Sequence, residues 1–173
     1  LIDVLFNLYV TLKSLHFPPE IIATSEELAS IKDKDLPIYS ILVPLYKEAN
    51  VLPEFIHSMD KLDYPKNKLA VFIVDDGSTD NTWKVVQRFA RNNQVRLIHK
   101  ENGGKHTALN HALQFVDSDL VGCLDADSYV HPQALRRIVA RFDDKEIMAV
   151  TPSVKIFNPD GICVAQEVQA DSV

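Results

Sequence analysis

Two carboxylates one residue apart, Asp125 and Asp127, end an apolar run that begins at Val121. Such a run is typical of a strand buried on both faces, and alternate residues of an extended chain point the same way, so both carboxylates can reach one small volume. Carboxylates that close repel each other unless a proton or a cation lies between them. Mg²⁺ or Mn²⁺, bridging to a substrate phosphate, would supply that charge. The alternative, in which both residues only end a strand and cap a helix, stays open here.

Two other predicted strands, residues 38–43 and 69–74, also run into polar loops. Asp75 and Asp76 follow the second strand, and their oxygens can accept hydrogen bonds from a base N–H or a ribose hydroxyl. Gly77 behind them lets the backbone come close to a ligand. Such a pair also serves as a helix cap, so this stretch alone does not decide between a site and a cap.

Tyr46 and Lys105 complete the candidates that the residues themselves suggest. Tyr46, in the loop after the first strand, can stack on a base or simply pack in its loop. Lys105 follows Gly103-Gly104 at a predicted helix start, where it can meet an anionic phosphate or remain solvated. His57, His99 and His131 lie on different elements, and His106 and His111 are five residues apart, which argues against a zinc site.

The elements that must position these residues alternate between strand and helix. Besides the three strands already mentioned, strands are predicted over 95–99 and 147–154, and helices are predicted from apolar spacing over 51–59, 85–90, 108–116 and 135–142. This order predicts an α/β fold with an open, mainly parallel sheet, helices on both faces, and the polar loops along one edge. Neither a Gly-x-Gly-x-x-Gly fingerprint nor a Walker loop occurs.

Composition limits the classes of function. The 173 residues are 46% hydrophobic, enough for one domain with a substantial core. A formal net charge of −6 argues against a nucleic-acid footprint, which needs clustered Lys and Arg. There are two cysteines, and Cys123 lies inside an apolar run, so we expect a reduced, cytosolic setting.

The first 37 residues differ from the rest. Residues 1–17 have apolar positions at helical spacing but are too short and too polar to span a membrane, so they predict an amphipathic helix, either packed on its own domain or lying at a membrane interface. Residues 18–37 are polar and punctuated by proline, which is typical of a connector. We therefore divide the chain into a helix and linker, 1–37, and a folded domain, 38–173.

Four motifs in order give the chain a family resemblance. They are Ile41-Leu42-Val43-Pro44-Leu45-Tyr46-Lys47-Glu48, Val74-Asp75-Asp76-Gly77-Ser78-Thr79-Asp80, Asn102-Gly103-Gly104-Lys105-His106-Thr107-Ala108-Leu109-Asn110 and Leu124-Asp125-Ala126-Asp127-Ser128. Together they resemble the family 2 glycosyltransferases with the GT-A fold, most closely the processive membrane enzymes of the cellulose-synthase and poly-N-acetylglucosamine-synthase kind. The resemblance covers about residues 38–155.

This resemblance implies an inverting transfer from a nucleotide sugar, most often a UDP-sugar, with Mg²⁺ or Mn²⁺. It also implies a role for each matching residue. Pro44, Leu45, Tyr46 and Glu48 would line the nucleoside pocket, Asp76 would bind the uracil with support from Asp75, Lys105 would lie near the nucleotide, Asp125 would reach the ribose or the metal, and Asp127 would ligate the metal. A metal on the diphosphate would stabilise the leaving group while an oxocarbenium-like sugar develops.

One part of the family pattern does not occur. The Thr-Glu-Asp type motif that supplies the acceptor base, and the Gln-x-x-Arg-Trp motif of processive members, are absent from the 173 residues. We therefore expect the base beyond Val173, the chain to be the donor-binding half of a catalytic domain, and little transfer by this chain alone. By the same resemblance the acceptor would be a glycan or a lipid-linked molecule, and the domain would sit at the cytoplasmic face of a membrane as part of an integral membrane protein.

Two alternative functions fit part of the sequence. Leu124-Asp125-Ala126-Asp127-Ser128 also resembles the nucleophile strand of haloacid-dehalogenase-type phosphohydrolases, although there that strand normally opens the domain. The chain could also be a module that binds a nucleotide without turnover. Binding of UDP with Mn²⁺, and its loss in Asp127→Ala, would favour the glycosyltransferase interpretation.

Overall fold

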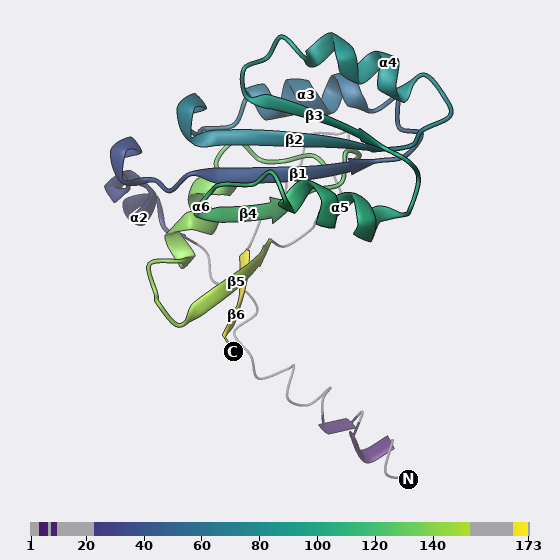
Figure 1. Ribbon diagram of the computed structural model, residues 1–173. Helices are drawn as coiled ribbons and strands as arrows, with labels where there is room; N and C mark the ends of the chain where they lie inside the picture. Colours follow the sequence, from purple (N-terminus) through teal and green to yellow (C-terminus); the bar gives the residue numbers. More distant parts are fainter. Residues whose placement is uncertain (1–3, 7, 10–22, 153–167, 173) are drawn as a thin grey trace, which may run out of the picture.

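The computed structural model describes residues 4–6, 8–9, 23–152 and 168–172 (Figure 1). Strands and helices alternate through most of this part of the chain, as the sequence predicts. The elements in chain order are α2 (Ser25–Ser30), η1 (Asp33–Asp35), β1 (Tyr39–Leu45), α3 (Leu52–Asp60), η2 (Lys66–Lys68), β2 (Leu69–Asp76), α4 (Thr82–Val86), η3 (Gln87–Phe89), β3 (Val95–Lys100), α5 (Lys105–Leu113), β4 (Leu120–Cys123), α6 (Ala134–Arg141), β5 (Ile147–Pro152) and β6 (Val168–Ser172).

Four strands form a parallel sheet in the order β3-β2-β1-β4, which confirms the predicted open α/β architecture. Its register pairs Leu45 with Asp75 and Asp75 with His99, so the carboxyl ends of three neighbouring strands lie level with one another. The polar loops therefore leave the sheet along one edge, as expected. Strands β5 and β6 form a separate antiparallel pair.

Side-chain alternation along the strands divides the core into two layers. Ile41, Val43 and Ile73 pack on one face of the sheet against residues of α3, α4 and α6. Leu42 and the other residues at alternate positions face α5 through its buried alanines. Figure 1 shows α5 on the side of the sheet away from α3. Helices thus cover both faces of the central strands β1 and β2, which explains their continuous apolar runs.

Pro44 does not end the first strand, which was expected to stop at Val43. Instead β1 continues to Leu45, with Pro44 paired with Val74. In a parallel strand, alternate residues direct their N–H and C=O toward the same neighbour. The carbonyl of Leu42 accepts a hydrogen bond from Leu124 on the β4 side, so Pro44 also faces that side, where β4 has already ended. The missing N–H of Pro44 therefore costs the sheet no hydrogen bond.

The prediction that the run from Val121 is buried on both faces is wrong. Strand β4 forms an edge of the four-stranded sheet, and its residues alternate between half-buried and exposed. Val121 is 44% exposed, and Cys123 is an exposed free cysteine. An edge strand has only one neighbour, so apolar composition alone did not reveal its position.

Part of the predicted linker is ordered secondary structure. Helix α2 begins with a capping box in which Thr24 and Glu27 satisfy each other's backbone N–H groups. Glu27 also pairs with Arg141 of α6 at 3.0 Å, and Arg136 of α6 pairs with Asp33. These ion pairs attach residues 23–36 to α6, and the division at residue 37 stays a prediction.

The predicted amphipathic helix over 1–17 lies mostly outside the described residues. Residues 4–6 and 8–9 are helical, and their apolar side chains are more than half exposed, as Phe6 is at 64%. Within the described part of the chain, no helix combines the length and the apolar character that crossing a bilayer requires.

Candidate functional site

The carboxylate of Asp76 organises the glycine loop that follows β3. It accepts hydrogen bonds from the backbone N–H groups of Gly103 and Gly104, the latter at 2.7 Å, and from the ammonium of Lys100 at 2.5 Å. The Asn102 side chain donates to the backbone carbonyl of Asp76. Asp76 is only 3% exposed, so these contacts replace the water that an ionised carboxylate would otherwise need.

These donors keep Asp76 ionised. Burial alone would raise the pKa of its carboxyl, but the Lys100 ammonium and the two glycine N–H groups outweigh burial and hold the pKa of Asp76 below its usual value. Lys100 is fixed in turn by the hydroxyl of Thr107 and the carbonyl of Glu101. The predicted partner of Asp76 was the uracil; its carboxylate oxygens here bind the loop, and the uracil contact stays a prediction.

From the sequence, Gly77 was expected to let the backbone approach a ligand. In the structure Gly77 lies close to a neighbouring loop of the protein. Its φ of +67° lies in the left-handed region, and a Cβ there would stand 2.6 Å from the backbone nitrogen of Asn102. Only glycine meets both conditions without strain. The turn after β2 and the glycine loop after β3 therefore pack backbone to backbone.

Asp125 and Asp127 lie in the turn after β4, on either side of a buried residue. Ala126 is 3% exposed and belongs to the core, whereas both aspartates are exposed. The backbone N–H of Ser128 closes the turn on the Asp125 carbonyl. With the middle residue buried, both carboxylates face outward, and their convergence on one volume stays a prediction.

Lys105 connects the two acidic pairs. It is the first residue of α5, directly after the loop that Asp76 holds, and its ammonium lies 2.5 Å from Asp125. The side chains of Lys105 and Asp125 are 55% and 53% exposed, so this ion pair is accessible to a ligand. Asp76, the glycine loop, Lys105 and Asp125 form a continuous chain of contacts along the carboxyl edge of the sheet.

Glu48 lies within electrostatic reach of both exposed aspartates. Partial burial raises the pKa of Glu48, and the negative charges of Asp127 and Asp125 raise it further, against the opposing effect of Lys105. One carboxylate oxygen of Glu48 is buried and has no hydrogen-bond partner among the residues that the structure describes. This corner of the edge therefore carries more negative charge than its neighbours neutralise.

The other predicted pocket residues differ in their accessibility. Pro44 and Leu45 are buried in β1, and Leu45 belongs to the hydrophobic core at 1% exposure. Tyr46 is 45% exposed, and the ammonium of Lys47 lies 4.9 Å from the centre of its ring. Of these residues, the Tyr46 and Glu48 side chains are the ones that can contact a ligand directly.

The oxygen donors suit a divalent cation that shares its coordination with a substrate. Among the described residues, no three His, Cys, Asp or Glu side chains converge into a metal cage of their own. Mg²⁺ is commonly held by one or two carboxylates together with substrate phosphates, which is what Asp125 and Asp127 offer. The uncompensated negative charge around Glu48 is what a cation would neutralise.

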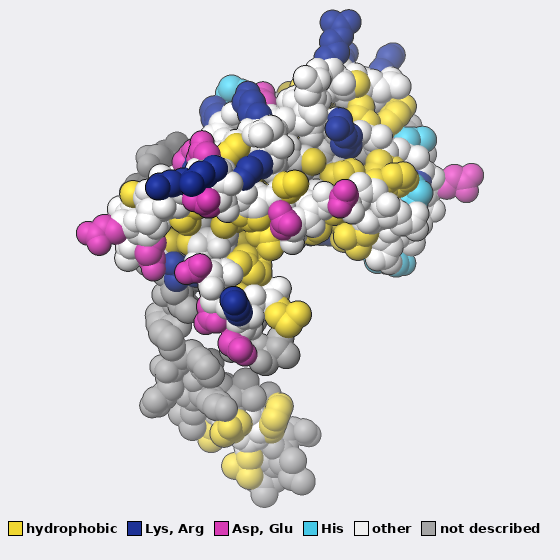
Figure 2. Space-filling model, turned by 60° about the vertical axis from the view of Figure 1, so that its left-hand side comes forward, with side chains coloured by type: hydrophobic (Ala, Val, Ile, Leu, Met, Phe, Trp, Pro, Cys, Tyr) yellow, Lys and Arg dark blue, Asp and Glu magenta, His cyan; other side chains and the backbone are white. Residues whose placement is uncertain are grey.

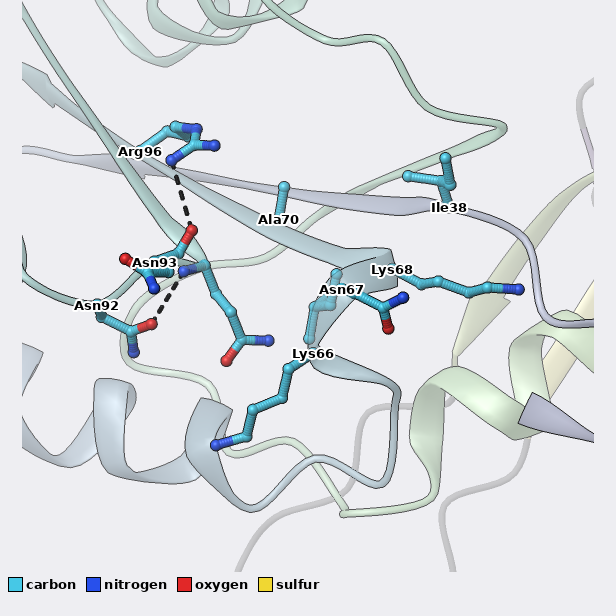
Figure 3. Close-up of a pocket in the computed structure, with 10 residues that line it drawn as sticks. Ile38, Lys66, Asn67, Lys68, Ala70, Asn92, Asn93 and Arg96 are labelled. Atoms are coloured by element: carbon cyan, nitrogen blue, oxygen red, sulfur yellow. Dashed lines mark hydrogen bonds between the residues drawn. The ribbon is translucent and has the colours of Figure 1, made fainter. Parts of the chain in front are cut away.

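A separate hollow lies at the opposite end of the sheet, by the amino ends of its strands. It has a volume of about 540 Å³ and is lined by amide and basic side chains near the amino ends of the strands (Figure 3). The ammonium of Lys68 is engaged by the carbonyls of Lys34 and Leu36, and Arg96 donates to the carbonyl of Asn93. In Figure 2, which brings the left-hand end of Figure 1 forward, basic side chains lie among acidic ones. None of the predicted site residues lines this hollow.

Comparison with known proteins assigns the family. Residues 40–166 match the family described as "Glycosyl transferase family 2". The chain belongs to this family. It is 36% identical to the chondroitin synthase of Pasteurella multocida over 132 residues, which are 75% of the chain and 14% of that protein. It is 30% identical to the poly-beta-1,6-N-acetyl-D-glucosamine synthase of Staphylococcus aureus over 149 residues, 85% of the chain and 36% of that protein.

Solved structures agree with this assignment. The mannosyltransferase PcManGT from Pyrobaculum calidifontis, in complex with GDP-Man and Mn²⁺, superposes with a TM-score of 0.69 at 28% identity, over 88% of the chain and 43% of that structure. TarS 1–349 of S. aureus with UDP-GlcNAc gives a TM-score of 0.54 at 29% identity, over 61% and 31%. The fold and family predicted from the four motifs are confirmed, and the phosphohydrolase alternative falls away. The glycosyltransferase domain spans less than half the length of each of these proteins.

Two residues of this edge, Lys100 and His99, are not predicted from the sequence pattern. Both end β3, where the register places His99 beside Asp75 and Lys100 beside Asp76. Two adjacent acidic residues at the end of one strand and two basic residues at the end of another are the signal that could have indicated this pairing.

Proposed function

We propose that this glycosyltransferase domain binds a nucleotide-sugar donor, a UDP-sugar, together with Mg²⁺ or Mn²⁺ at the carboxyl edge of its sheet. The observation that carries the proposal is the contact chain from Asp76 through Lys105 to Asp125, beside the exposed Asp127 and the charge-strained Glu48. The complexes of TarS with UDP-GlcNAc and of PcManGT with GDP-Man and Mn²⁺ support a donor of this class.

Each side chain at this edge has a role that its chemistry allows. Asp127 and Asp125 supply oxygen ligands to the cation, and Lys105 offers a positive charge to the diphosphate. Tyr46 offers a ring face to the base. When bound, the cation would neutralise charge that develops on the departing diphosphate. We assign none of these residues the role of base toward the acceptor.

We further propose that the reaction inverts the anomeric centre and extends a polysaccharide or a glycolipid. The chondroitin synthase and the poly-N-acetylglucosamine synthase among the relatives support a glycan product. The acceptor would be a glycan or a lipid-linked molecule.

A titration of the chain with UDP, with and without Mn²⁺, tests the donor site by calorimetry. We expect binding that strengthens when Mn²⁺ is present, and Asp127→Ala should lose the metal-dependent part, at least about tenfold in affinity. Asp117→Ala, an exposed acidic residue between α5 and β4, serves as the matched control. Equal metal dependence in Asp127→Ala and the wild type would exclude the metal role, and preference for GDP over UDP would change the donor to a GDP-sugar.

We also propose that the domain works at the cytoplasmic face of a membrane, as part of a longer membrane protein. The exposed apolar side chains of residues 4–6 and 8–9 support an interfacial contact. Co-sedimentation with phosphatidylglycerol vesicles should fall in Phe6→Asp and be unchanged in Phe115→Asp, a control that removes another phenylalanine that is more than half exposed. If both variants sediment like the wild type, these residues make no such contact.

A further inference from the structure

A line of hydrogen bonds runs from β3 to the loop that carries Tyr46 and Glu48. At its start, Nδ1 of His99 lies 2.7 Å from Oδ2 of Asp75. The other carboxylate oxygen of Asp75 accepts the backbone N–H of Ser78 at 3.2 Å. The hydroxyl of Ser78 accepts the backbone N–H of Lys47 at 2.9 Å. These three contacts join the ends of the strands β3, β2 and β1.

Asp75 depends on this line because it has no access to water. Its side chain is completely buried, whereas that of His99 is 47% exposed. A buried carboxylate is costly unless donors compensate it. When Asp75 is ionised it can only accept, so Nδ1 of His99 must donate the hydrogen. The imidazole is therefore the side-chain donor that holds the orientation of Asp75.

The far end of the line holds a strained backbone. Lys47 has a φ of +59°, and among the described residues it alone combines a side chain with a left-handed φ. This conformation is unfavourable for a residue with a Cβ and persists only where its surroundings impose it. Among the contacts around it, Lys47 N–H donates to the hydroxyl of Ser78, which fixes one end of this residue. Tyr46 and Glu48 flank Lys47, so its conformation sets the directions of both side chains.

The ring of His99 is itself positioned by Trp83 of α4. Their ring centroids are 4.8 Å apart, at an interplanar angle of 40°. Trp83 packs against the main core, so the imidazole is held between a fixed aromatic surface and a fixed carboxylate. This arrangement leaves the ring little freedom to leave Asp75.

We propose that His99 is a positioning residue for donor binding, which acts through Asp75 and Ser78 to hold Lys47, and with it Tyr46 and Glu48, in the binding conformation. The inference rests on the proposed function for one consequence only, the weaker donor binding that we expect when the line is broken. Its structural part, the protection of the Lys47 amide, needs no ligand.

Two substitutions separate the hydrogen bond of His99 from its packing. His99→Asn can place its Nδ2 where Nδ1 stands, because both nitrogens are bonded to Cγ, and so keeps the donor without the ring. His99→Phe keeps the ring on Trp83 without the donor. If His99 only fills space, His99→Phe should resemble the wild type and His99→Asn should be impaired. A positioning role predicts the reverse order.

Amide hydrogen exchange of Lys47, followed by NMR without ligand, is the first measurement. We expect exchange to be faster by about three- to tenfold in His99→Phe and in Ser78→Ala, the range that the net contribution of one hydrogen bond gives, and close to wild type in His99→Asn. Far-UV circular dichroism checks that each variant keeps its fold, since the emission of Trp83 itself responds to the loss of the adjacent imidazole. Unchanged Lys47 exchange in a folded His99→Phe would overturn the proposal.

The second measurement is the affinity for UDP with Mn²⁺ in the same variants. His99→Phe and Ser78→Ala should each bind about three- to tenfold more weakly, and the double variant should be no weaker than the worse single one, because both break the same line. If the fold-changes in affinity of the two single variants multiply in the double variant, the two residues act independently and not through one line. A wild type that binds neither UDP nor GDP would refute the proposed function, and the exchange data would still decide the role of His99.

Discussion

The two acidic pairs of this domain follow strands of the same sheet but differ in almost every physical property. Asp75 and Asp76 end a central strand and are 0% and 3% exposed. Each is bonded to a basic residue of β3 and to backbone N–H groups, Asp75 in its own turn and Asp76 in the glycine loop after β3. Asp125 and Asp127 follow an edge strand and are exposed, and Lys105 is the basic residue that pairs with Asp125. The first pair is bonded inside the protein, whereas the second pair faces solvent.

The position of each strand in the sheet explains this difference. β2 has a hydrogen-bonded strand on both sides, so its terminal residues meet side chains and loops from β1 and β3. Within the part of the chain that the structure describes, β4 pairs with β1 alone, and Asp125 and Asp127 beyond its end are exposed. At the end of a central strand a carboxylate is therefore surrounded by donors from the protein, whereas at the end of an edge strand it stays exposed. Four predictions test this contrast, from the largest expected effect to the smallest.

Asp76→Ala should have the largest effect, on stability. It removes the acceptor of Lys100 and of two backbone N–H groups, and we expect a loss of roughly 2–4 kcal/mol in the free energy of unfolding by urea. Because the folded pKa of Asp76 lies below its ordinary value of about 3.9, its stabilisation is complete above that pH and is lost as the pH falls through the folded pKa. The difference from wild type should therefore shrink below about pH 4.

The matched control is Asp127→Ala, which should change the free energy of unfolding by less than about 0.5 kcal/mol. Equal losses in both variants would show that the two pairs do not differ in the way proposed.

This contrast also marks the limit of the sequence analysis. Apolar runs and turn residues predicted the strands, the parallel sheet and the edge at which Asp76 and Asp127 lie, because periodicity and chain order determine those features. They did not reveal that β4 forms an edge, since strand order depends on tertiary packing. The partners His99 and Lys100 were missed for the same reason, because the pairing of Asp75 with His99 spans 24 residues of sequence.

Gly77→Ala should have the second-largest effect. The left-handed φ costs about 1 kcal/mol for alanine, and the added Cβ would meet the Asn102 backbone at 2.6 Å, so we expect a loss of about 2 kcal/mol in a urea titration. Gly77→Asn separates the two causes, because asparagine tolerates a left-handed φ but brings the same Cβ. If Gly77→Ala is as stable as the wild type, the two loops do not pack backbone to backbone.

Glu48→Gln should have a smaller effect, of opposite sign. The raised pKa of Glu48 means that the folded state keeps its proton at pH values where the unfolded state has released it. Stability contributed by that proton is lost as the pH rises from the ordinary value of about 4.3 through the folded pKa. At neutral pH, Glu48→Gln should therefore melt at a higher temperature than the wild type, and the difference should vanish near pH 4. A lower melting temperature at pH 7 would mean that the charge of Glu48 is already compensated.

We expect the smallest effect from a substitution of Lys105. Comparing Lys105 with Lys100 tests the difference between the two acidic pairs through their lysine partners. Lys105 and its partner are both more than half exposed, so Lys105→Met should change the free energy of unfolding by less than about 0.5 kcal/mol, and added salt should remove even that difference. Lys100 is 18% exposed and donates to Asp76, Glu101 and Thr107, so Lys100→Met should cost about 2 kcal/mol and depend little on salt. Urea titrations at low and high NaCl measure both. If both substitutions lower the free energy of unfolding equally, Asp125 is held by its lysine as firmly as Asp76 is, and the edge position of β4 does not make Asp125 more accessible to a ligand.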